Sequence, residues 1–490
     1  RIGRLVGDRL YVTLHNTAEK MQAGEQIKEQ REGSKEGQNG RTMDMTVGSP
    51  IGHILRFALP LLVGNVFQQL YNMVDSLVVG NYVGANALAA VGNCGSMNNL
   101  FFALANGLSI GIGILVAQYF GAKNEQRIRA VIANAVYVLG GVGIVTSILG
   151  ILLSRPAMLL LGTPDTILED SVIYMAVTCA GMLGIAFYNG ASAILRALGD
   201  SRTPLYFLIV SCLINVVLDL LFVLQFQWSV FGVALATIIA QFVSAGACII
   251  YAWKRVSYFR LKKEEFKPDK QIIKRSFELG FPIALQSSMI SISCLVLQGV
   301  INSFGESVMA ASNIINRIEQ LVQQPFSSLH AALTTYAGQN IGAENVDRVK
   351  KGYRQSGAVA AIFGLATIPV AYLFGENIIG AFVKDAEVIA IGTKALHIDS
   401  LFYAVVGMIH VSRAVLNGCG DTGFAVLNGL TEVVCRVVYS QVFTRIPFIG
   451  YWGIWVTTAA TWVTTAFVCV LRYMSGVWQP EKREAKRKKW

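Results

Sequence analysis

Two aspartates stand inside long apolar stretches of the sequence, where ionisable side chains are rare. Asp75 ends the segment YNMVD (71–75), and Asp219 ends the segment NVVLD (215–219). Asn215 and Asp219 are four residues apart, so on a helix their side chains share one face. A carboxylate inside a membrane segment costs about 2.5–3.5 kcal/mol on insertion scales, so a functional role is its default interpretation.

The position of each aspartate along its apolar segment predicts its depth in a bilayer. At a rise of 1.5 Å per residue, Asp75 lies about 8 Å and Asp219 about 10 Å from the outer ends of their helices. Thr237, on the next segment, lies about 10 Å from the same side. Two carboxylates in a low-dielectric environment raise each other's affinity for protons. These residues predict a cation or proton site; the alternative is that each aspartate caps a partner helix or pairs with a neighbour.

The segments that must hold these residues are long and apolar. Of the 490 residues, 53% are apolar and 14% are charged, whereas a soluble chain carries about 25% charged residues. Spanning a bilayer takes about 20 residues. Twelve apolar runs approach or exceed that length: 54–80, 88–119, 129–152, 167–195, 204–226, 230–252, 277–301, 308–338, 357–376, 391–416, 423–444 and 452–474. We therefore expect an all-α integral membrane protein with twelve transmembrane helices.

Basic residues alternate between the loops that join these runs. The connector 253–276 carries nine Lys or Arg and the loop 120–130 carries three, whereas loops 81–87 and 302–307 carry none. The positive-inside rule places the basic connector in the cytoplasm, and both termini with it. We expect a multi-pass protein of the cell membrane.

The chain repeats itself at an offset of 221 residues. The segment AQYFGAKN (117–124) corresponds to GQNIGAEN (338–345), and Gly199-Asp200 corresponds to Gly420-Asp421. Each half has six predicted spans, and an even number returns the chain to the same side of the membrane. The halves are therefore expected to be parallel repeats, related by an axis along the membrane normal.

The repeat and the charge pattern together predict the domain organisation. We expect a polar, disordered extension at 1–45, a six-helix lobe at 46–252, a basic cytosolic linker at 253–276, a second six-helix lobe at 277–476 and a basic cytosolic tail at 477–490. Met43 and Met45 stand directly before the first apolar run, and we expect one of them to be the natural start of translation.

The second half provides an internal comparison for the two aspartates. The offset puts Arg436 at the position of Asn215 and Ser440 at the position of Asp219, and no acidic residue falls at the position of Asp75. A purely structural aspartate would be expected in both halves. The asymmetry favours a cation site in the first half alone.

Other polar residues inside the spans are candidates for lining a central cavity. They are Gln68, Asn189, Arg317, Gln320, Gln324 and Arg436. For the eighth-span residues the alternative is hydrogen bonding between packed helices. For Arg436 it is an ion pair with Glu432, four residues earlier on the same helix.

The sequence lacks the motifs of the common enzyme classes. It contains no Gly-Lys dipeptide for a P-loop and no HExxH. The basic residues lie between apolar runs, which indicates membrane topology and not nucleic-acid binding. A secondary transporter is favoured. The alternatives are a lipid-linked oligosaccharide flippase of similar build and a channel or receptor, which would not need titratable carboxylates at matched depth.

Four motifs in combination give the sequence a family resemblance. FALPLL (57–62), YNMVD (71–75), LRALGD (195–200) and NVVLD (215–219) resemble those of the multidrug and toxic compound extrusion (MATE) transporters. The resemblance implies two six-helix lobes around a central cavity. It also implies export of organic cations or other amphipathic compounds in exchange for protons or sodium ions, by a protein that we expect to be monomeric and to need no prosthetic cofactor.

The resemblance is strongest to the branch typified by the DNA-damage-inducible protein F. Members of that branch have a cation site in the N-lobe. The resemblance implies such a site here at Asp75, Asn215, Asp219 and Thr237. Pro60, which removes a backbone hydrogen bond from the helix of Asp75, matches the proline at which that helix can bend. A second branch carries acidic residues in spans seven and ten. Here those positions fall near Ile290 and Val406, so no C-lobe ion site of that kind is expected.

Overall fold

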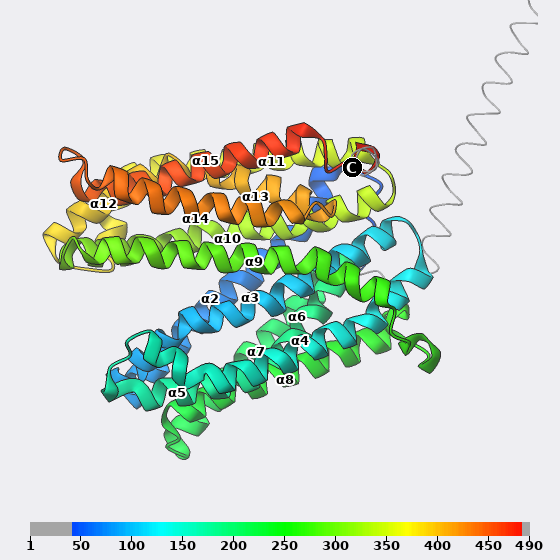
Figure 1. The fold of residues 1–490 in the computed structure, drawn as a ribbon, viewed down its shortest axis with the longest axis horizontal. Helices are drawn as coiled ribbons and strands as arrows, with labels where there is room; N and C mark the ends of the chain where they lie inside the picture. Colours follow the sequence, from blue (N-terminus) through cyan, green and yellow to red (C-terminus); the bar gives the residue numbers. More distant parts are fainter. Residues whose placement is uncertain (1–41, 483–490) are drawn as a thin grey trace, which may run out of the picture. The chain divides into compact units, whose positions relative to one another are not determined.

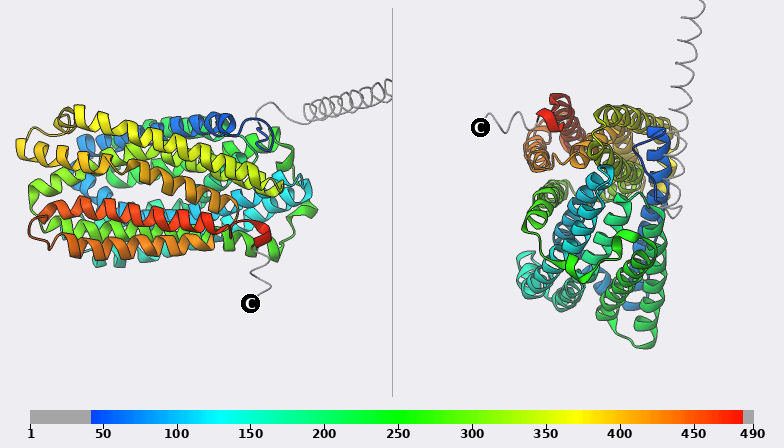
Figure 2. Two further views of the ribbon diagram at one scale, coloured as in Figure 1. Left: turned by 90° about the horizontal axis from the view of Figure 1, so that it is seen from above. Right: turned by 90° about the vertical axis from the view of Figure 1, so that its right-hand side faces the viewer.

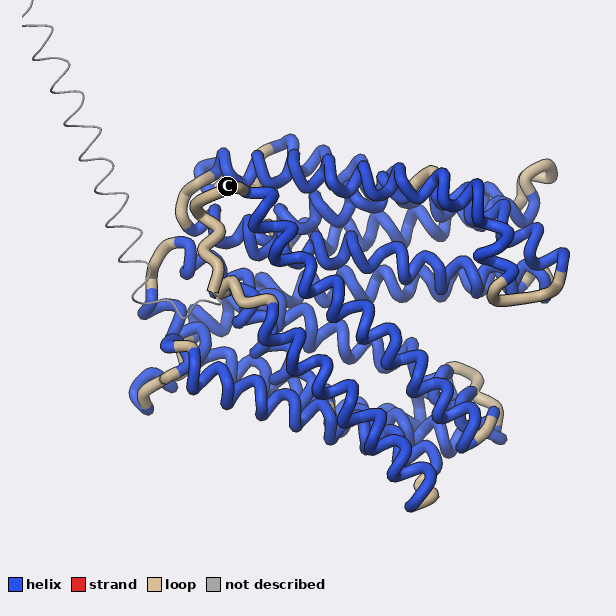
Figure 3. The backbone as a smooth tube through the Cα atoms, turned by 180° about the vertical axis from the view of Figure 1, so that it is seen from behind, coloured by secondary structure: helices blue, strands red, loops and turns tan. Residues whose placement is uncertain are grey.

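The computed structural model describes residues 42–482, in which Met43 and the residues after it form one compact unit. The predicted extension 1–45 lies outside the described residues apart from 42–45, as do residues 483–490 of the basic tail. In the described part the chain forms helices joined by loops, with no strand (Figure 3). The predicted all-α fold is confirmed.

In the described part of the chain, seven α-helices precede the linker and form the N-lobe. They are α2 (Pro50–Val78), α3 (Ala85–Gly121), α4 (Glu125–Leu160), α5 (Asp165–Ala180), α6 (Met182–Ala197), α7 (Arg202–Leu220) and α8 (Ser229–Arg255). One π-helical turn, Val79–Val83, continues α2, and another, Leu221–Gln225, continues α7.

Between the linker and residue 482, seven further α-helices form the C-lobe. They are α9 (Lys270–Asn302), α10 (Glu306–Gly342), α11 (Val346–Gly380), α12 (Ala386–Ser400), α13 (Tyr403–Gly418), α14 (Gly423–Phe443) and α15 (Gly453–Ser475). Figure 1 shows the helices of the two lobes as two groups, and Figure 2 gives two further views of the same arrangement.

The twelve predicted spans are recovered, but two of them are bent. The fourth run consists of α5 and α6, which meet at 46°, and the tenth consists of α12 and α13, which meet at 47°. Among the described residues, eight helices are long and apolar enough to cross a membrane, or ten when each bent pair counts as one span. The remaining two spans are α10 and α14. Both carry charged residues toward the interior of the C-lobe, which lowers their hydropathy.

Polar residues at the loop ends begin several helices. Asp200 Oδ1 accepts hydrogen bonds from the backbone N–H groups of Arg202 (3.1 Å) and Thr203 (3.0 Å) at the start of α7. Asp269 Oδ1 accepts from Gln271 N at 2.8 Å at the start of α9. Such caps satisfy backbone donors that have no partner inside the helix. They determine where the helices of the site begin.

The two lobes contact each other mainly where α3 crosses α9. Gly107 and Gly111 of α3 lie against Ala284 and Gly280 of α9, so closely that a Cβ atom on either α3 glycine would overlap the α9 backbone. Small residues permit this approach between helices in a membrane. In Figure 1 the two groups of helices separate away from this crossing.

The end of the molecule that holds the linker, called the linker end here, is closed by a symmetric contact. Gln118 Nε2 of α3 donates to Gly418 O of the C-lobe at 2.9 Å. Gln339 Nε2 of α10 donates to Ala197 O of the N-lobe, also at 2.9 Å. The two donors are repeat-equivalent residues, and so are the two acceptors. Each bond runs from one lobe to the other.

Segments before α2 and α9 fasten the linker end further. Met45 N donates to Gln339 Oε1 at 2.9 Å, and Arg348 NH2 donates to Met45 O at 3.0 Å. In the linker, Glu265 accepts from Arg129 of α4, with 2.5 Å between Nε and Oε1 and 2.7 Å between NH2 and Oε2. Each segment thus also binds to the lobe that it does not lead into.

Large apolar side chains cover the outward faces of several helices. Leu152 and Leu160 of α4 are 68% and 85% exposed, and Leu373 of α11 is 73% exposed. Water would not favour so much exposed hydrocarbon, whereas lipid tails would. These faces agree with helices that lie in a bilayer.

Candidate functional site

Asp75 and Asp219 come together between α2 and α7. Their carboxyl groups lie within hydrogen-bonding reach of each other. Asp219 is fully buried and Asp75 is half-buried. Within the described residues, one oxygen of each carboxyl group, Oδ1, is buried without a hydrogen-bond partner. Two ionised carboxylates can only accept hydrogen bonds. A favourable contact between them therefore requires a shared proton or a bound cation.

The amide of Asn215 joins this carboxylate pair to two neighbouring helices. In the orientation that gives both amide atoms partners, its nitrogen donates to Asp219 Oδ2 at 2.9 Å and to the Tyr71 hydroxyl at 3.2 Å. Its oxygen then accepts from the Thr237 hydroxyl of α8 at 3.2 Å. The structure therefore brings Asp75, Asn215, Asp219 and Thr237 into one cluster, to which Tyr71 also belongs.

Helix periodicity explains how the chain builds this cluster. Tyr71 and Asp75 are four residues apart on α2, and Asn215 and Asp219 are four residues apart on α7, so each pair shares a helix face. A π-helical turn follows each carboxylate within a few residues. Such turns are frequent at functional sites. Beyond the carboxylates, an apolar cluster closes the site; it comprises Val78, Val79, Ala87, Val223, Val230 and Val233.

A cavity of about 600 Å³ reaches the carboxylate pair from inside the N-lobe. Asp75, Thr237 and Tyr71 line it, whereas Asn215 and Asp219 do not contribute to its wall. The predicted residues Gln68 and Asn189 line it too. The rest of its wall includes aromatic and amide side chains: Phe102, Tyr174, Tyr188, Asn72, Asn98, Asn99 and Asn106. Aromatic faces and amide oxygens are suited to an organic cation.

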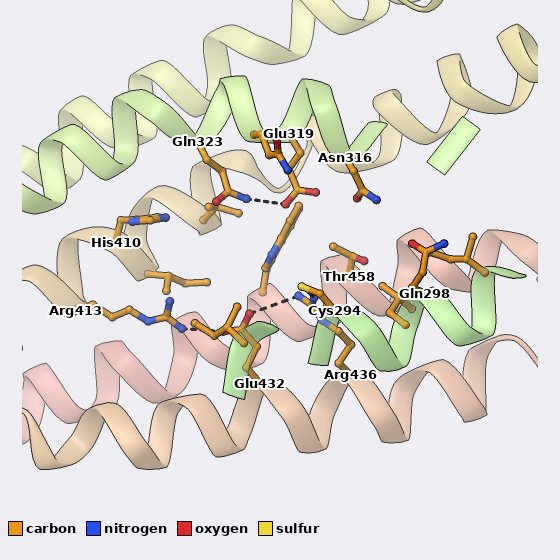
Figure 4. Close-up of a pocket in the computed structure, with 17 residues that line it drawn as sticks. Cys294, Gln298, Asn316, Glu319, Gln323, His410, Arg413, Glu432, Arg436 and Thr458 are labelled. Atoms are coloured by element: carbon orange, nitrogen blue, oxygen red, sulfur yellow. Dashed lines mark hydrogen bonds and ion pairs between the residues drawn. The ribbon is translucent and has the colours of Figure 1, made fainter. Parts of the chain in front are cut away.

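A second cavity, of about 460 Å³, lies inside the C-lobe (Figure 4). The predicted residues Gln320 and Arg436 line it, together with Glu319, Arg413 and Glu432. Arg317 is exposed and is not part of its wall, and Gln324 bonds to Gln320 O at 2.9 Å in its own helix. For Gln324 the structure shows a hydrogen bond within the helix.

The ion pair expected between Glu432 and Arg436 is present, but it is the weaker of two. Glu432 Oε2 accepts from Arg413 NH2 at 2.8 Å, whereas Glu432 Oε1 lies 3.5 Å from Arg436 NH2. Arg413 was not among the predicted site residues. Its position inside the tenth apolar run is the same signal that identified Asp75, so the sequence contained the information to find it.

The tenth span also carries a buried acid that the sequence analysis did not single out. Asp399, near the end of α12, is only 1% exposed and interacts electrostatically with Glu319. The expected acidic positions were counted to Ile290 and Val406, neither of which is acidic. Asp399 stands seven residues before Val406 in the sequence, so the family position near Val406 did not mark it.

Pro60 lies inside α2, which runs without a break from Pro50 to Val78. In this structure the helix is therefore continuous through the position where a bend was expected to be possible.

Within residues 42–482, no group of three or more His, Cys, Asp or Glu side chains is placed to hold a metal ion.

Comparison with known proteins identifies the class of the molecule. The family model MatE matches residues 60–221 and again residues 282–442. The two matched segments occupy equivalent parts of the two lobes and together exceed half of the chain. The chain belongs to the MATE family: it is a membrane transporter and not an enzyme.

Individual relatives and solved structures agree with this assignment. The "Probable multidrug resistance protein YoeA" of Bacillus subtilis (strain 168) is 28% identical over 408 residues, which cover 81% of this chain and 88% of the relative. The "Probable multidrug resistance protein NorM" of Thermotoga maritima is 25% identical over 434 residues, 87% of this chain and 92% of the relative. A solved structure described as the outward-facing conformation of a multidrug resistance MATE family transporter has a TM-score of 0.82 at 24% identity, covering 89% of this chain and 98% of its own.

Proposed function

We propose that this chain exports amphipathic organic cations from the cell in exchange for protons or sodium ions. The observation that carries the proposal is the contact between Asp75 and Asp219 at the wall of the N-lobe cavity. The names of the relatives, which are multidrug resistance proteins, support the same kind of substrate.

The carboxylate pair provides a physical basis for exchange. A proton or sodium ion bound between Asp75 and Asp219 removes negative charge from the cavity wall, and this weakens the attraction for an organic cation in the same cavity. When the inorganic cation leaves, the charge returns and the organic cation binds more tightly. The two ligands thus oppose each other's binding, which is what antiport requires.

Alternating access requires that the linker end open in part of the cycle. We propose that the structure represents an outward-facing state, because the linker end is cytoplasmic by the charge pattern and is closed by Gln118 and Gln339. α2 is the proposed moving element. It carries Asp75, it lacks one backbone hydrogen bond at Pro60, and a π-helical turn follows it.

The surroundings of the transporter are also part of the proposal. We place it as a monomer in the cell membrane, with both termini in the cytoplasm and lipid around its exposed apolar faces. The basic linker supports this orientation. Transport needs the coupling ion and no prosthetic group.

Proteoliposomes containing the full chain test the proposal. With rhodamine 123 as the cationic probe, we expect uptake driven by an imposed pH gradient or by an imposed sodium gradient. Asp75→Asn and Asp219→Asn should each abolish gradient-driven uptake while the protein still inserts and remains monodisperse. Asp347→Asn, which alters an exposed carboxylate at the linker end, is the matched control and should transport normally. Full activity of both site variants, or no uptake under either gradient, would reject the proposal.

A further inference from the structure

One wall of the C-lobe cavity carries two arginines, Arg413 and Arg436, but only one carboxylate, Glu432. Arg413 and Arg436 both approach Glu432, and the short bond, 2.8 Å, goes to Arg413. Arg413 also donates to Asn428 Oδ1 at 2.6 Å. Arg436 is left with the longer contact of 3.5 Å to Glu432. The guanidinium of Arg436 is therefore only partly compensated.

The remaining donors of Arg436 lack strong acceptors. NH1 donates to Cys294 Sγ at 2.8 Å, and a thiol sulfur is a weak acceptor. Nε is buried and, within the described residues, has no hydrogen-bond partner. The whole residue is 6% exposed and lines the cavity. A buried guanidinium with unused donors favours an anionic group in the space beside it.

Glu319 carries the opposite charge on the facing wall. Figure 4 shows Glu319 and Gln323 on α10, across the cavity from Glu432 and Arg436 on α14. Glu319 Oε1 accepts from Gln323 Nε2 at 2.7 Å. In the described part of the chain, no Lys, Arg or His lies within ion-pair distance of Glu319. Arg436 interacts with this carboxylate electrostatically across the cavity but forms no ion pair with it, so Glu319 can still accept a cationic group.

We propose that the C-lobe cavity binds zwitterionic amphiphiles, with a carboxylate on Arg436 and a cationic nitrogen toward Glu319. Apolar side chains between the two charged walls, Ile290, Leu297, Val406 and Trp462, provide a surface for the hydrocarbon body. Burying such a ligand completes both partly compensated charges, whereas a simple cation would satisfy Glu319 alone. The inference rests on the proposed export function and specifies a substrate class for it.

The sequence repeat shows how the two cavities come to differ. Arg436 occupies the repeat position of Asn215, and Thr458, which lines the C-lobe cavity, occupies that of Thr237. The N-lobe holds a carboxylate pair at this level, whereas the C-lobe holds a guanidinium. The two lobes thus present different charges to ligands at equivalent places.

A matched pair of dyes tests the inference on the purified full chain. Rhodamine 110 is a zwitterion with a free carboxylate, and rhodamine 123 is its methyl ester, which is only cationic. We expect fluorescence anisotropy to show about tenfold tighter binding of rhodamine 110, the factor that one charged hydrogen bond contributes. Arg436→Gln should reduce this ratio to about one. Arg445→Gln, at an exposed arginine outside the cavity, is the control and should keep it.

A further variant guards against a folding defect in Arg436→Gln. Glu319→Gln should weaken the binding of rhodamine 110, because it removes the carboxylate that faces the cationic nitrogen of the bound zwitterion. Equal affinities in the wild type, or a ratio that survives Arg436→Gln, would overturn the inference. If wild-type proteoliposomes transport rhodamine 123 but binding shows no preference between the dyes, the inference fails while the proposed function stands. If neither dye is transported, the proposed function fails, and the binding ratio still decides the inference.

Discussion

Gln118 and Gln339 make the same hydrogen bond from opposite lobes. Each side-chain amide donates, at 2.9 Å, to a backbone carbonyl at the end of a helix in the other lobe, Gly418 O for Gln118 and Ala197 O for Gln339. The donors are repeat equivalents and so are the acceptors. Closure of the linker end is therefore a two-fold contact that the sequence repeat generates.

Removing this pair of bonds should favour opening of the linker end. Each hydrogen bond contributes about 1 kcal/mol, so Gln118→Ala with Gln339→Ala should shift the closed-to-open ratio by about tenfold or more. Positions 126 and 347 are exposed repeat equivalents at this end. The distance between spin labels at these positions, measured by double electron–electron resonance, should show a longer-distance population. Gln298→Ala is the control, because Gln298 bonds only to Asn302 in its own helix among the described residues. An unchanged distance distribution in the double variant would contradict the role of these bonds.

Two glycines that contact these glutamines should tolerate substitution even less well than the glutamines themselves. A Cβ atom on Gly121 would overlap Gln339 O, and a Cβ atom on Gly342 would overlap Gln118 O. Overpacking of this kind costs about 1–3 kcal/mol. We expect Gly121→Ala or Gly342→Ala to populate the open linker end in the same spin-label measurement. Gly141→Ala, where the added Cβ meets open space, should behave as the wild type; closure that persists in both test variants would argue against a tight fit.

Tyr71 should contribute to transport through Asn215. Its hydroxyl lies 3.2 Å from the Asn215 amide nitrogen, which also bonds to Asp219. Loss of one hydrogen bond of about 1 kcal/mol predicts that Tyr71→Phe lowers gradient-driven rhodamine 123 uptake about fivefold without abolishing it. Tyr82→Phe, at an exposed tyrosine on the π-helical turn after α2, is the matched control. Wild-type uptake by Tyr71→Phe would show that the hydroxyl has no such role.

The linker should detach from the N-lobe at low pH. Hydrogen bonds from Arg129 and from Lys262 N lower the pKa of Glu265 from its ordinary value of 4.5 to about 2. Because the pKa is lower in the docked state, docking is fully stabilised above about pH 5 and weakens as the pH falls toward 2. The rate of limited proteolysis within the linker, measured with an acid-tolerant protease below pH 4, should therefore increase as the pH decreases.

The Glu265→Gln variant separates this effect from general acid sensitivity. It should be cleaved faster than the wild type at pH 7, and its cleavage should depend less on pH. Glu264→Gln, at the exposed neighbouring residue, should match the wild type. Equal cleavage of the two variants at neutral pH would show that the Arg129 contact does not hold the linker.

The sequence pointed to the residues of the carboxylate cluster because ionisable residues are rare in apolar runs; their role as a cation site stays a prediction. Asp75, Asn215, Asp219 and Thr237 were found from composition, helix periodicity and family motifs, and the structure places them in one cluster. Tyr71 was missed, although its spacing of four from Asp75 puts it on the same face. A tyrosine in an apolar run carries no charge and so attracts less attention.

Tertiary features were harder to predict from the sequence. The bends between α5 and α6 and between α12 and α13 have no proline at the break, so hydropathy alone gave two straight spans. Gln118 and Gln339 were visible in the repeat motif, but their acceptors lie in the other lobe, far away along the chain. The C-lobe cavity depends on which helix faces converge, and no single run of sequence contains that information.

The dependence of rhodamine 123 affinity on the coupling ion tests the central claim most directly. If Asp75 and Asp219 hold the exchanged cation, wild-type affinity should decrease as the proton concentration or the sodium concentration rises, because the two ligands oppose each other. In Asp219→Asn the affinity should become independent of both. An affinity that responds to protons or sodium equally in the wild type and in Asp219→Asn would contradict the account.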